Sequence, residues 1–426
     1  MKKINIAKID EEIFYDKLDN GLEVFFYPRE NCQNVYATLT TKFGSIYKSF
    51  VPIGKTKFLT VPDGIAHFLE HKIFAQEDGE DVALFFEKSG TSYNAHTSLK
   101  STTYEVSGPN NMIQNILFLL DYVQSPYFTL ENVEMEKGII KEEINMCNDN
   151  PWNILYDKIR YNTFKEDPIR YSISGSTSDI DKINKELLYE CYNTFYHPSN
   201  MFLVVTGNFD KEQLLKCIKE NQDKKNFREY KEVKLKKIKE PNSVYKKDEI
   251  VICNTNIPKF SYNIKVPIDN IKDISKRKLM LYLYIVMNIL FDETSEFSFK
   301  LKEEKIITNN IDFDMLNTDK HILISLINET FNYEVLKNRI EEVLKDFVVD
   351  EKSFDRKKKV LISNELFGYD SIVVINNIIT DNILFDGKIE NDIISIIESL
   401  NMDELNKILK MIDFTNVSTV VVKKEL

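Results

Sequence analysis

Five consecutive residues, His67-Phe68-Leu69-Glu70-His71, constrain this chain more than any other stretch. Successive residues of an α-helix are about 100° apart, so Glu70 lies about 60° to one side of His67 and His71 about 40° to the other. The three side chains therefore share one helix face. Two imidazoles at this spacing can hold Zn²⁺, and the carboxylate can handle the proton of a water molecule bound there. The alternative is a surface pair of histidines beside a solvated glutamate.

The composition allows two hydrophobic cores and argues against several classes of protein. A length of 426 residues exceeds one ordinary domain, and 43% of the residues are hydrophobic. The net charge is −11, without a Lys/Arg block that would follow a phosphate backbone, so we expect no nucleic-acid partner. The longest apolar run, 280–291, is too short to cross a bilayer, so we expect no membrane insertion.

The cysteines indicate a reducing compartment. Their number is odd, and no two are spaced as C-x-x-C, which argues against a disulfide framework and a structural cysteine–zinc site. The first ten residues lack the apolar core of a signal peptide. We therefore expect a cytoplasmic protein with reduced thiols. The five cysteines are Cys32, Cys147, Cys191, Cys217 and Cys253.

The order of the expected elements divides the chain into two parts that repeat one another. Residues 223–249 are charged and poor in apolar clusters, so we predict a linker there, between domains at 1–222 and 250–426. Segments 190–207 and 405–423 both read as helix, short turn and apolar strand. We predict an α+β fold of two structurally similar α/β halves, related by duplication, with mixed, largely antiparallel sheets flanked by helices.

Four expected elements carry the candidate chemistry. The helix that contains the histidines should begin after Pro62-Asp63-Gly64, with Asp63 as its N-cap. Strands are predicted at 92–97 and 102–107. A long helix is predicted over 130–148, started by Thr129.

That long helix offers a third metal ligand. A catalytic zinc site usually has three protein ligands and one position open to water. Glu136 and Glu143 are seven residues apart and so lie about 20° apart on one stripe. Ile139 and Ile140 lie close to this stripe, which predicts that it faces the protein. Glu143 could ligate the metal, and Glu136 could hold an imidazole N–H in the required tautomer. The Lys/Glu-rich surroundings equally allow both to lie on the surface.

The histidine motif and the downstream glutamates together resemble a known family. H-x-x-E-H is the inverted zincin order, and with the segment 136–143 it is similar to the pitrilysin/insulinase family of zinc peptidases. In that family a glutamate at the position of Glu143 completes the metal site with the two histidines, and one at the position of Glu136 supports it. Segments 62–66, 92–97 and 195–201 also match. The resemblance covers most of residues 10–210, is architectural beyond them, and is strongest to short bacterial members.

The resemblance implies a fold, an activity and a way of binding substrate. The chain would form one half of a clamshell and act as a zinc metalloendopeptidase on peptides or small polypeptides held in its chamber. Asn94, Ala95 and His96 would lie on an edge strand, onto which an extended peptide adds as one more strand. His96 could also be read as a metal ligand, but a substrate-facing or core position is preferred. His197 and His321 are expected to be structural.

The second half departs from the family pattern. Many relatives carry an Arg and a Tyr there, after a glycine-rich loop, that reach the peptide at the zinc site of the facing half. Lys302 and Asn309 occupy those positions here, and the preceding loop, 291–297, has no glycine. Lysine cannot replace a bidentate arginine, and asparagine cannot replace a phenol that donates to an oxyanion.

The resemblance and this departure together indicate a paralogous subunit without zinc that supplies the Arg/Tyr pair, or a homodimer. Two alternatives stay open. The chain could be a non-catalytic subunit that binds peptides or acts as a scaffold. It could also be an accessory protein that matures a ribosomally made peptide or a modified protein.

Overall fold

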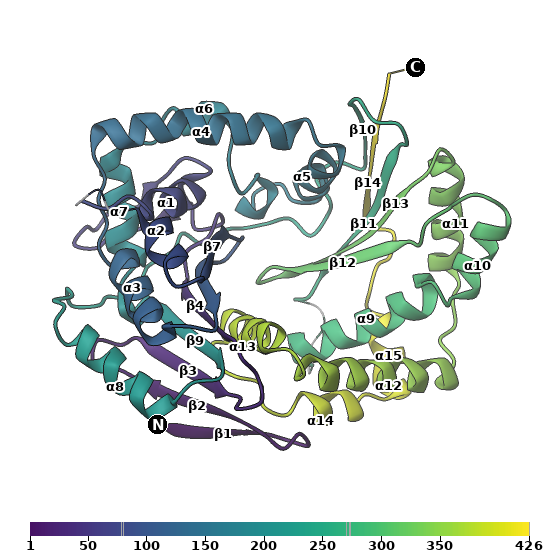
Figure 1. Cartoon of the computed structure of the whole chain (residues 1–426). Coiled ribbons are helices and arrows are strands. Elements are labelled where there is room, and N and C mark those ends of the chain that lie inside the picture. Colours follow the sequence, from purple (N-terminus) through teal and green to yellow (C-terminus); the bar gives the residue numbers. More distant parts are fainter. Residues whose placement is uncertain (78, 80, 270, 272–273, 426) are drawn as a thin grey trace. The chain divides into compact units, whose positions relative to one another are not determined.

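The computed structural model describes residues 1–77, 79, 81–269, 271 and 274–425, which form two compact units (Figure 1). Each unit is built from three separate stretches of chain. Unit 1 contains residues 1–144, 172–237 and 366–392. Unit 2 contains residues 145–171, 238–365 and those from 393 onward.

Unit 1 is built on a seven-stranded sheet with the order β1-β2-β3-β9-β4-β8-β7. Neighbouring strands are antiparallel except β3 and β9, which are parallel. The strand β7 lies at one edge. The bounds are β1 (Lys2–Ile6), β2 (Glu11–Lys17), β3 (Glu23–Pro28), β4 (Val35–Thr41), β7 (Ser92–Thr97), β8 (Thr102–Gly108) and β9 (Met201–Gly207), with a separate small pair, β5 (Ser49–Phe50) and β6 (Leu59–Thr60).

Helices cover both faces of this sheet and bury its apolar side chains. One core cluster lies under α1, α3 and α7, and a second joins α13 to β3 and β9. The helices of unit 1 are α1 (Ile65–Ile73), α2 (Val82–Glu87), α3 (Met112–Val123), α4 (Leu130–Asn148), α6 (Thr177–Ile180), α7 (Lys185–Phe195), α8 (Lys211–Gln222) and α13 (Ile372–Asp386), with the 3₁₀ turn η2 (Pro198–Asn200). The last residues of α4 belong to unit 2.

Unit 2 is built on a five-stranded sheet with the order β10-β14-β11-β13-β12. Its strands are β10 (Asp248–Ile252), β11 (Lys259–Pro267), β12 (Asp312–Asn317), β13 (His321–Glu329) and β14 (Val417–Lys423). Its helices are α5 (Pro151–Thr163), α9 (Lys276–Phe291), α10 (Glu296–Glu303), α11 (Tyr333–Lys345), α12 (Glu351–Gly368), α14 (Ile393–Glu398) and α15 (Met402–Leu409), with the 3₁₀ turn η1 (Pro168–Arg170). No helix of the described part of the chain is long and apolar enough to span a bilayer.

The two sheets share one connectivity. Unit 1 has β3-β9-β4-β8-β7 and unit 2 has β10-β14-β11-β13-β12, so both follow the order first, last, second, fourth, third along the chain. In both, the first and last strands are parallel and the other pairs antiparallel. The segments 190–207 and 405–423 correspond to α7–β9 and α15–β14. The predicted pair of similar α/β halves with mixed, largely antiparallel sheets is confirmed, and a duplication explains the shared order.

Each unit contains one helix from the other half of the chain. The predicted division at 223–249 does not include this exchange. α5 follows α4 in the first half of the chain but packs on β11 and β14 of unit 2. α13 follows α12 in the second half but packs on β4 and β9 of unit 1. These are corresponding strands of the two sheets, so the exchange is reciprocal. The segment 223–247 has no helix, and Leu235 forms a bridge with Phe50 of β5.

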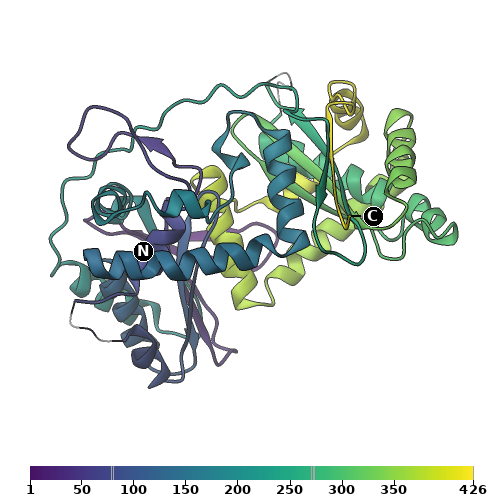
Figure 2. The same cartoon turned by 90° about the horizontal axis from the view of Figure 1, so that it is seen from above.

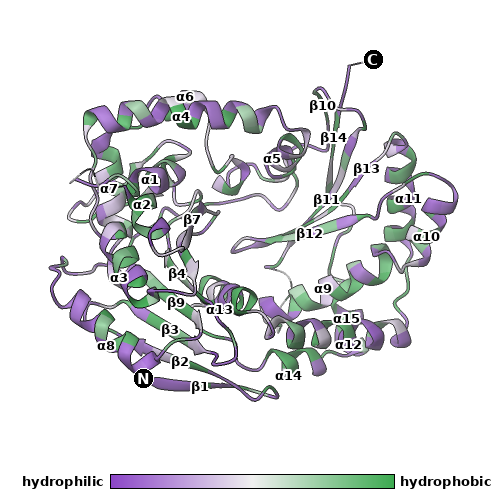
Figure 3. Cartoon of the chain, in the orientation of Figure 1, coloured by the Kyte–Doolittle hydropathy of each residue, from purple (hydrophilic) through white to green (hydrophobic). Residues whose placement is uncertain are grey.

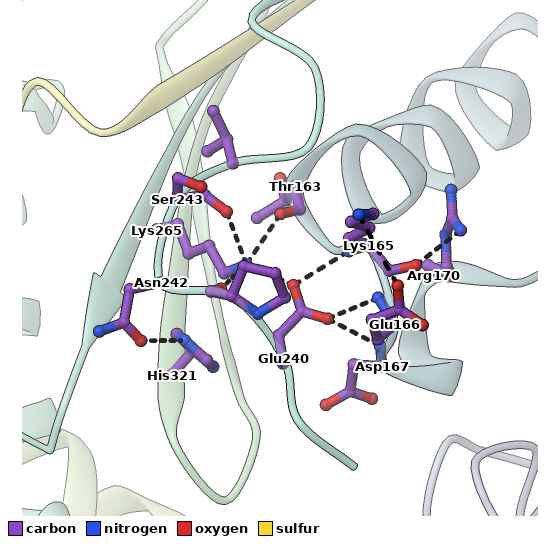
Figure 4. Close-up of polar contacts among 12 residues, drawn as sticks. Thr163, Lys165, Glu166, Asp167, Arg170, Glu240, Asn242, Ser243, Lys265 and His321 are labelled. Carbon is purple, nitrogen blue, oxygen red and sulfur yellow. Dashed lines mark hydrogen bonds and ion pairs between the residues drawn. The ribbon is translucent and has the colours of Figure 1, made fainter.

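A buried ion pair connects three segments of unit 2 (Figure 4). The Nζ of Lys265 in β11 lies 2.6 Å from Glu240, and the two side chains are 0% and 4% exposed. Burial works to raise the pKa of Glu240, but Lys265 and backbone N–H groups hold it below its ordinary value. Lys265 also donates to the backbone carbonyls of Thr163, Pro241 and Ser243. The Glu240 carboxylate accepts the N–H groups of Lys165, Glu166 and Asp167, just after α5.

Replacing Lys265 by methionine is expected to destabilise the protein by about 3 kcal/mol, because it leaves a buried carboxylate without its counter-charge. Lys320→Met is the matched control, since Lys320 pairs with Asp269 at 3.2 Å but the side chains are 57% and 52% exposed. An exposed pair contributes about 0–1 kcal/mol. Urea denaturation of both variants measures the difference, and equal losses of stability would contradict the role given to the buried pair.

Candidate metal centre

Helix α1 carries His67, Glu70 and His71, as predicted, but it begins differently from the expectation. Its N-cap is Gly64, which has φ 83° and no side chain to cap the helix. The prediction that Asp63 is the N-cap is wrong, because its carboxylate lies 2.6 Å from the Nζ of Lys48. The N-cap position has a left-handed backbone conformation, which glycine adopts without strain.

The start of α1 is held by a close contact with the loop 172–175. A Cβ at Gly64 would lie 2.3 Å from the carbonyl oxygen of Ser174, and a Cβ at Gly175 would lie 2.5 Å from that of Asp63. The two backbones therefore touch where any larger residue would separate them. This contact fixes the first turn of α1, and it places Ile173 and Ser174 beside the histidines, which sequence reasoning missed.

Helix α4 supplies the two glutamates. Its bounds match the prediction, and the Thr129 hydroxyl accepts the N–H of Asn132 at 3.1 Å, as an N-cap does. The helix is unbroken in Figure 2 and alternates between hydrophilic and hydrophobic residues in Figure 3. Ile140 is fully buried, but Ile139 is 58% exposed. The prediction that this stripe is buried is thus wrong for Ile139. Glu136 and Glu143 lie at the border between the buried and the exposed faces of α4, and Ile139 lies on the exposed side of that border.

The two helices bring His67, His71 and Glu143 together. One ligand atom of each lies within 4.8 Å of the others, the one such group of three found in the described part of the chain. The Nε2 atoms of His67 and His71 each lie 3.5 Å from a Glu143 oxygen. Tetrahedral coordination with bonds of about 2.0–2.2 Å separates neighbouring donors by about 3.4 Å. The two nitrogen–oxygen distances, one to each oxygen of Glu143, agree with that separation, so the three side chains could together hold one zinc ion.

Glu136 contacts the Nδ1 of His71, the ring nitrogen that does not face Glu143. Its carboxylate lies 3.1 Å from the Nδ1 of His71 and 3.1 Å from the Nζ of Lys72, which is itself buried. A carboxylate at Nδ1 favours the tautomer that leaves Nε2 free for a metal. Burial works to raise the pKa of Glu136, but His71 and Lys72 hold it below its ordinary value. Glu136 is therefore positioned to support His71, and it does not line the pocket described below.

The two histidines have opposite protonation tendencies. Burial, with a smaller contribution from His71, lowers the pKa of His67 to about 4. Burial also works to lower the pKa of His71, but the hydrogen bond and charge of Glu136, with the charges of Glu70 and Glu143, outweigh it and raise that pKa above its ordinary value. His67 is therefore neutral near pH 7, which is the form that binds metal.

Glu70 lies beside the group of donors and outside it. Its side chain is 7% exposed, and one carboxylate oxygen accepts the Thr97 hydroxyl at 2.6 Å. Burial raises the pKa of Glu70 above its ordinary value, against this hydrogen bond. A carboxylate with a raised pKa beside a metal site is suited to accept and return a proton near neutral pH.

An open pocket of about 480 Å³ lies over these side chains. One wall is the strand β7, which is an edge strand as expected and packs beside α1 (Figure 1). Asn94 and His96 are exposed on it and Ala95 is partly buried, so a core position for His96 is excluded. The lining residues are His67, Glu70, His71, Asn94, Ala95, His96, Thr97, Glu143, Ile173 and Ser174.

The other histidines are structural, as expected. His197 caps η2, where its Nδ1 accepts the N–H of Ser199 at 3.1 Å. His321 is 1% exposed on β13, its Nε2 lies 3.2 Å from the Asn242 side chain (Figure 4), and burial lowers its pKa to about 4.

The two residues at the positions of the expected Arg and Tyr are both exposed in unit 2. Lys302 lies on α10 and contacts the Asn310 side chain, and Asn309 donates to Glu329 at 2.9 Å.

Two family models match the chain. "Insulinase (Peptidase family M16)" matches residues 60–177, which include both histidines and both glutamates of the site. "Peptidase M16 inactive domain" matches residues 182–361.

Similar proteins and structures agree with these matches. The chain is 36% identical to the uncharacterized zinc protease YmfH of Bacillus subtilis over 96% of both chains. A putative M16-like peptidase from Alicyclobacillus acidocaldarius superposes with a TM-score of 0.91 at 29% identity, covering 98% of this chain and 100% of that one. The alpha subunit of mitochondrial-processing peptidase from Homo sapiens is 30% identical over 47% of this chain and 37% of that protein.

Proposed function

Because this chain belongs to the insulinase family, peptidase family M16, we propose that it is a zinc metallopeptidase that cleaves peptides or small polypeptides. The observation that carries the proposal is the convergence of His67, His71 and Glu143 from two helices, with a buried carboxylate beside them. A relative that is similar over nearly its whole length is named a zinc protease, which supports the same conclusion.

His67, His71 and Glu143 would hold the zinc ion. A bound zinc ion would lower the pKa of a water molecule and polarise the scissile carbonyl. Glu136 and Lys72 keep His71 oriented with its Nε2 toward the other donors. Glu70 accepts a proton from the attacking water and returns it to the departing amine, so one carboxylate serves as base and then as acid.

The substrate would add to the edge of the sheet at β7. Among the strands that the structure describes, none pairs with the outer side of β7, so its backbone groups are available to an extended peptide. Asn94, Ala95 and His96 would provide these contacts on one wall of the pocket, with Ile173 and Ser174 also lining it. Backbone pairing gives affinity with little dependence on side chains, so the enzyme would accept varied sequences in extended form.

A second subunit would complete the site. Lys302 and Asn309 have local contacts in unit 2 and lack the fork of an arginine and the phenol of a tyrosine. A paralogous subunit that binds no zinc but carries an Arg/Tyr pair would supply these two groups. The two subunits would form a clamshell, with this chain as one half. One relative is named as a subunit of a processing peptidase, which supports an assembly. A homodimer is the alternative.

We expect one zinc ion per chain. Glu143→Gln should weaken zinc retention by at least about 100-fold, which is more than the loss of a residue that only hydrogen-bonds a metal ligand costs. Glu142→Gln is the matched control, because Glu142 is the neighbouring, exposed residue of α4. Metal analysis after dialysis against a competing chelator measures both. Equal zinc retention in the two variants would exclude Glu143 as a ligand, and a wild-type chain without zinc would favour the non-catalytic binding subunit.

Glu70→Gln is expected to keep zinc but to lower kcat by about 10²–10⁴-fold, because the amide cannot accept the proton of water. Cleavage of an unstructured peptide by the active assembly, with zinc content measured alongside, tests this. Normal cleavage by the variant would remove the role given to Glu70.

The isolated chain is expected to cleave peptides weakly or not at all, and addition of a paralogue that lacks H-x-x-E-H but carries the Arg/Tyr pair is expected to restore cleavage. Sedimentation of the same samples reports the oligomeric state. Full activity of the chain as a monomer would rule out the two-subunit proposal.

A further inference from the structure

Thr97 is the last residue of β7, and its hydroxyl lies against the buried carboxylate of Glu70. The Oγ1 of Thr97 is 2.6 Å from one oxygen of Glu70. Exposure alternates along β7, and Thr97 belongs with Tyr93 and Ala95 to the partly buried row. Tyr93 contacts Phe74 at the end of α1, with ring centroids 6.1 Å apart, so this row faces the helix that carries Glu70.

The neighbouring strand determines where the Thr97 hydrogen points. Thr102 of β8 lies opposite Thr97, with the two hydroxyl oxygens 3.3 Å apart. The Thr102 hydroxyl donates its only hydrogen to the carbonyl of Phe43 at 2.8 Å. Thr97 can therefore donate either to a neutral hydroxyl at 3.3 Å or to a carboxylate at 2.6 Å. The bond to the Glu70 oxygen is the shorter of the two, so the hydrogen points to Glu70.

This hydrogen bond holds the Glu70 carboxylate in one orientation. The terminal torsion of a glutamate is broad, so a carboxylate without a partner rotates among many positions. Among the residues the structure describes, Thr97 is the one side chain that hydrogen-bonds Glu70. With one oxygen held by Thr97, the other is left for the water that the base must meet.

We propose that Thr97 is a positioning residue for Glu70, so that the strand along which the peptide binds also orients the base. The proposal rests on the proposed function, and it adds a residue and a coupling to it. Fixing a reacting group at the correct distance and angle raises the rate of a step without changing how tightly the substrate is held.

The kinetic test is Thr97→Val, which keeps the branched shape and removes the hydroxyl. We expect kcat to fall by about 10–100-fold, by analogy with the loss of a partner that orients a metal ligand, with KM and zinc content unchanged. Thr97→Ser keeps the hydroxyl and should restore kcat to within a few-fold of the wild type.

The matched control is Thr103→Val on β8. The Thr103 hydroxyl is more deeply buried than that of Thr97, and its partner is Thr40 at 3.0 Å. This variant loses a threonine hydroxyl on the neighbouring strand without touching Glu70 and should keep the wild-type kcat. A kcat for Thr97→Val equal to that of Thr103→Val, or a failure of Thr97→Ser to restore it, would overturn the proposal.

A crystal structure of Thr97→Val gives a readout that needs no activity. The Glu70 carboxylate should be rotated or spread over several positions in Thr97→Val and ordered as in the wild type in Thr97→Ser. A Glu70 carboxylate with one unchanged orientation in Thr97→Val would overturn the proposal even if the enzyme is active. Failure of the proposed function is a separate result, because wild-type protein would then show no metal-dependent cleavage that requires Glu70.

Discussion

The bond between Glu136 and His71 is the interaction on which the rest of the site depends. It joins α1 to α4 at 3.1 Å, and the same carboxylate meets the buried Lys72 one residue along α1. Glu143 lies two turns farther along α4. The contacts of Glu136 fix the position of α4 along α1, and this position also sets the distance from Glu143 to both imidazoles. A partly buried carboxylate that binds two side chains of α1 at once allows little sliding of one helix along the other.

Much of this site could be predicted from local periodicity, and the missed parts depend on contacts distant in sequence. The bounds of α4, the four-residue spacing of the histidines and the existence of the strand β7 follow from patterns that repeat within a few residues, whereas the position of β7 at the edge of the sheet is implied only by the family resemblance. Periodicity misplaced Ile139, because a stripe has two borders and only packing decides which is buried. Asp63 matched a capping pattern, but Lys48 is a competing partner. The loop with Ile173 and Ser174 reaches the site through a backbone contact with Gly64, a residue more than a hundred positions away.

The two copies of the architecture differ at the position of the helix that carries His67 and His71. Both sheets follow one connectivity, and α9, with α10 after it, occupies in unit 2 the place in the chain order that α1 has in unit 1, between the second and third shared strands. α9 has no histidine and is largely apolar, with Leu283, Val286 and Met287 fully buried. The same framework can therefore hold a polar cluster at one copy of this position and a hydrophobic core at the other. The match of residues 182–361 to a domain described as inactive agrees with that division.

The reciprocal exchange of α5 and α13 means that the two copies have lost their independence. Ile375, Ile379 and Ile383 of α13 fill the core against β3 and β9, and Asn376 hydrogen-bonds the Thr38 hydroxyl at 2.7 Å inside unit 1. A polypeptide that ends in the segment 223–247 would lack these side chains and expose an apolar sheet face to water, and the complementary fragment would lack α5 in the same way. A protein assembled like this cannot be divided at 223–247 without opening both cores, so each half of the chain needs the other in order to fold.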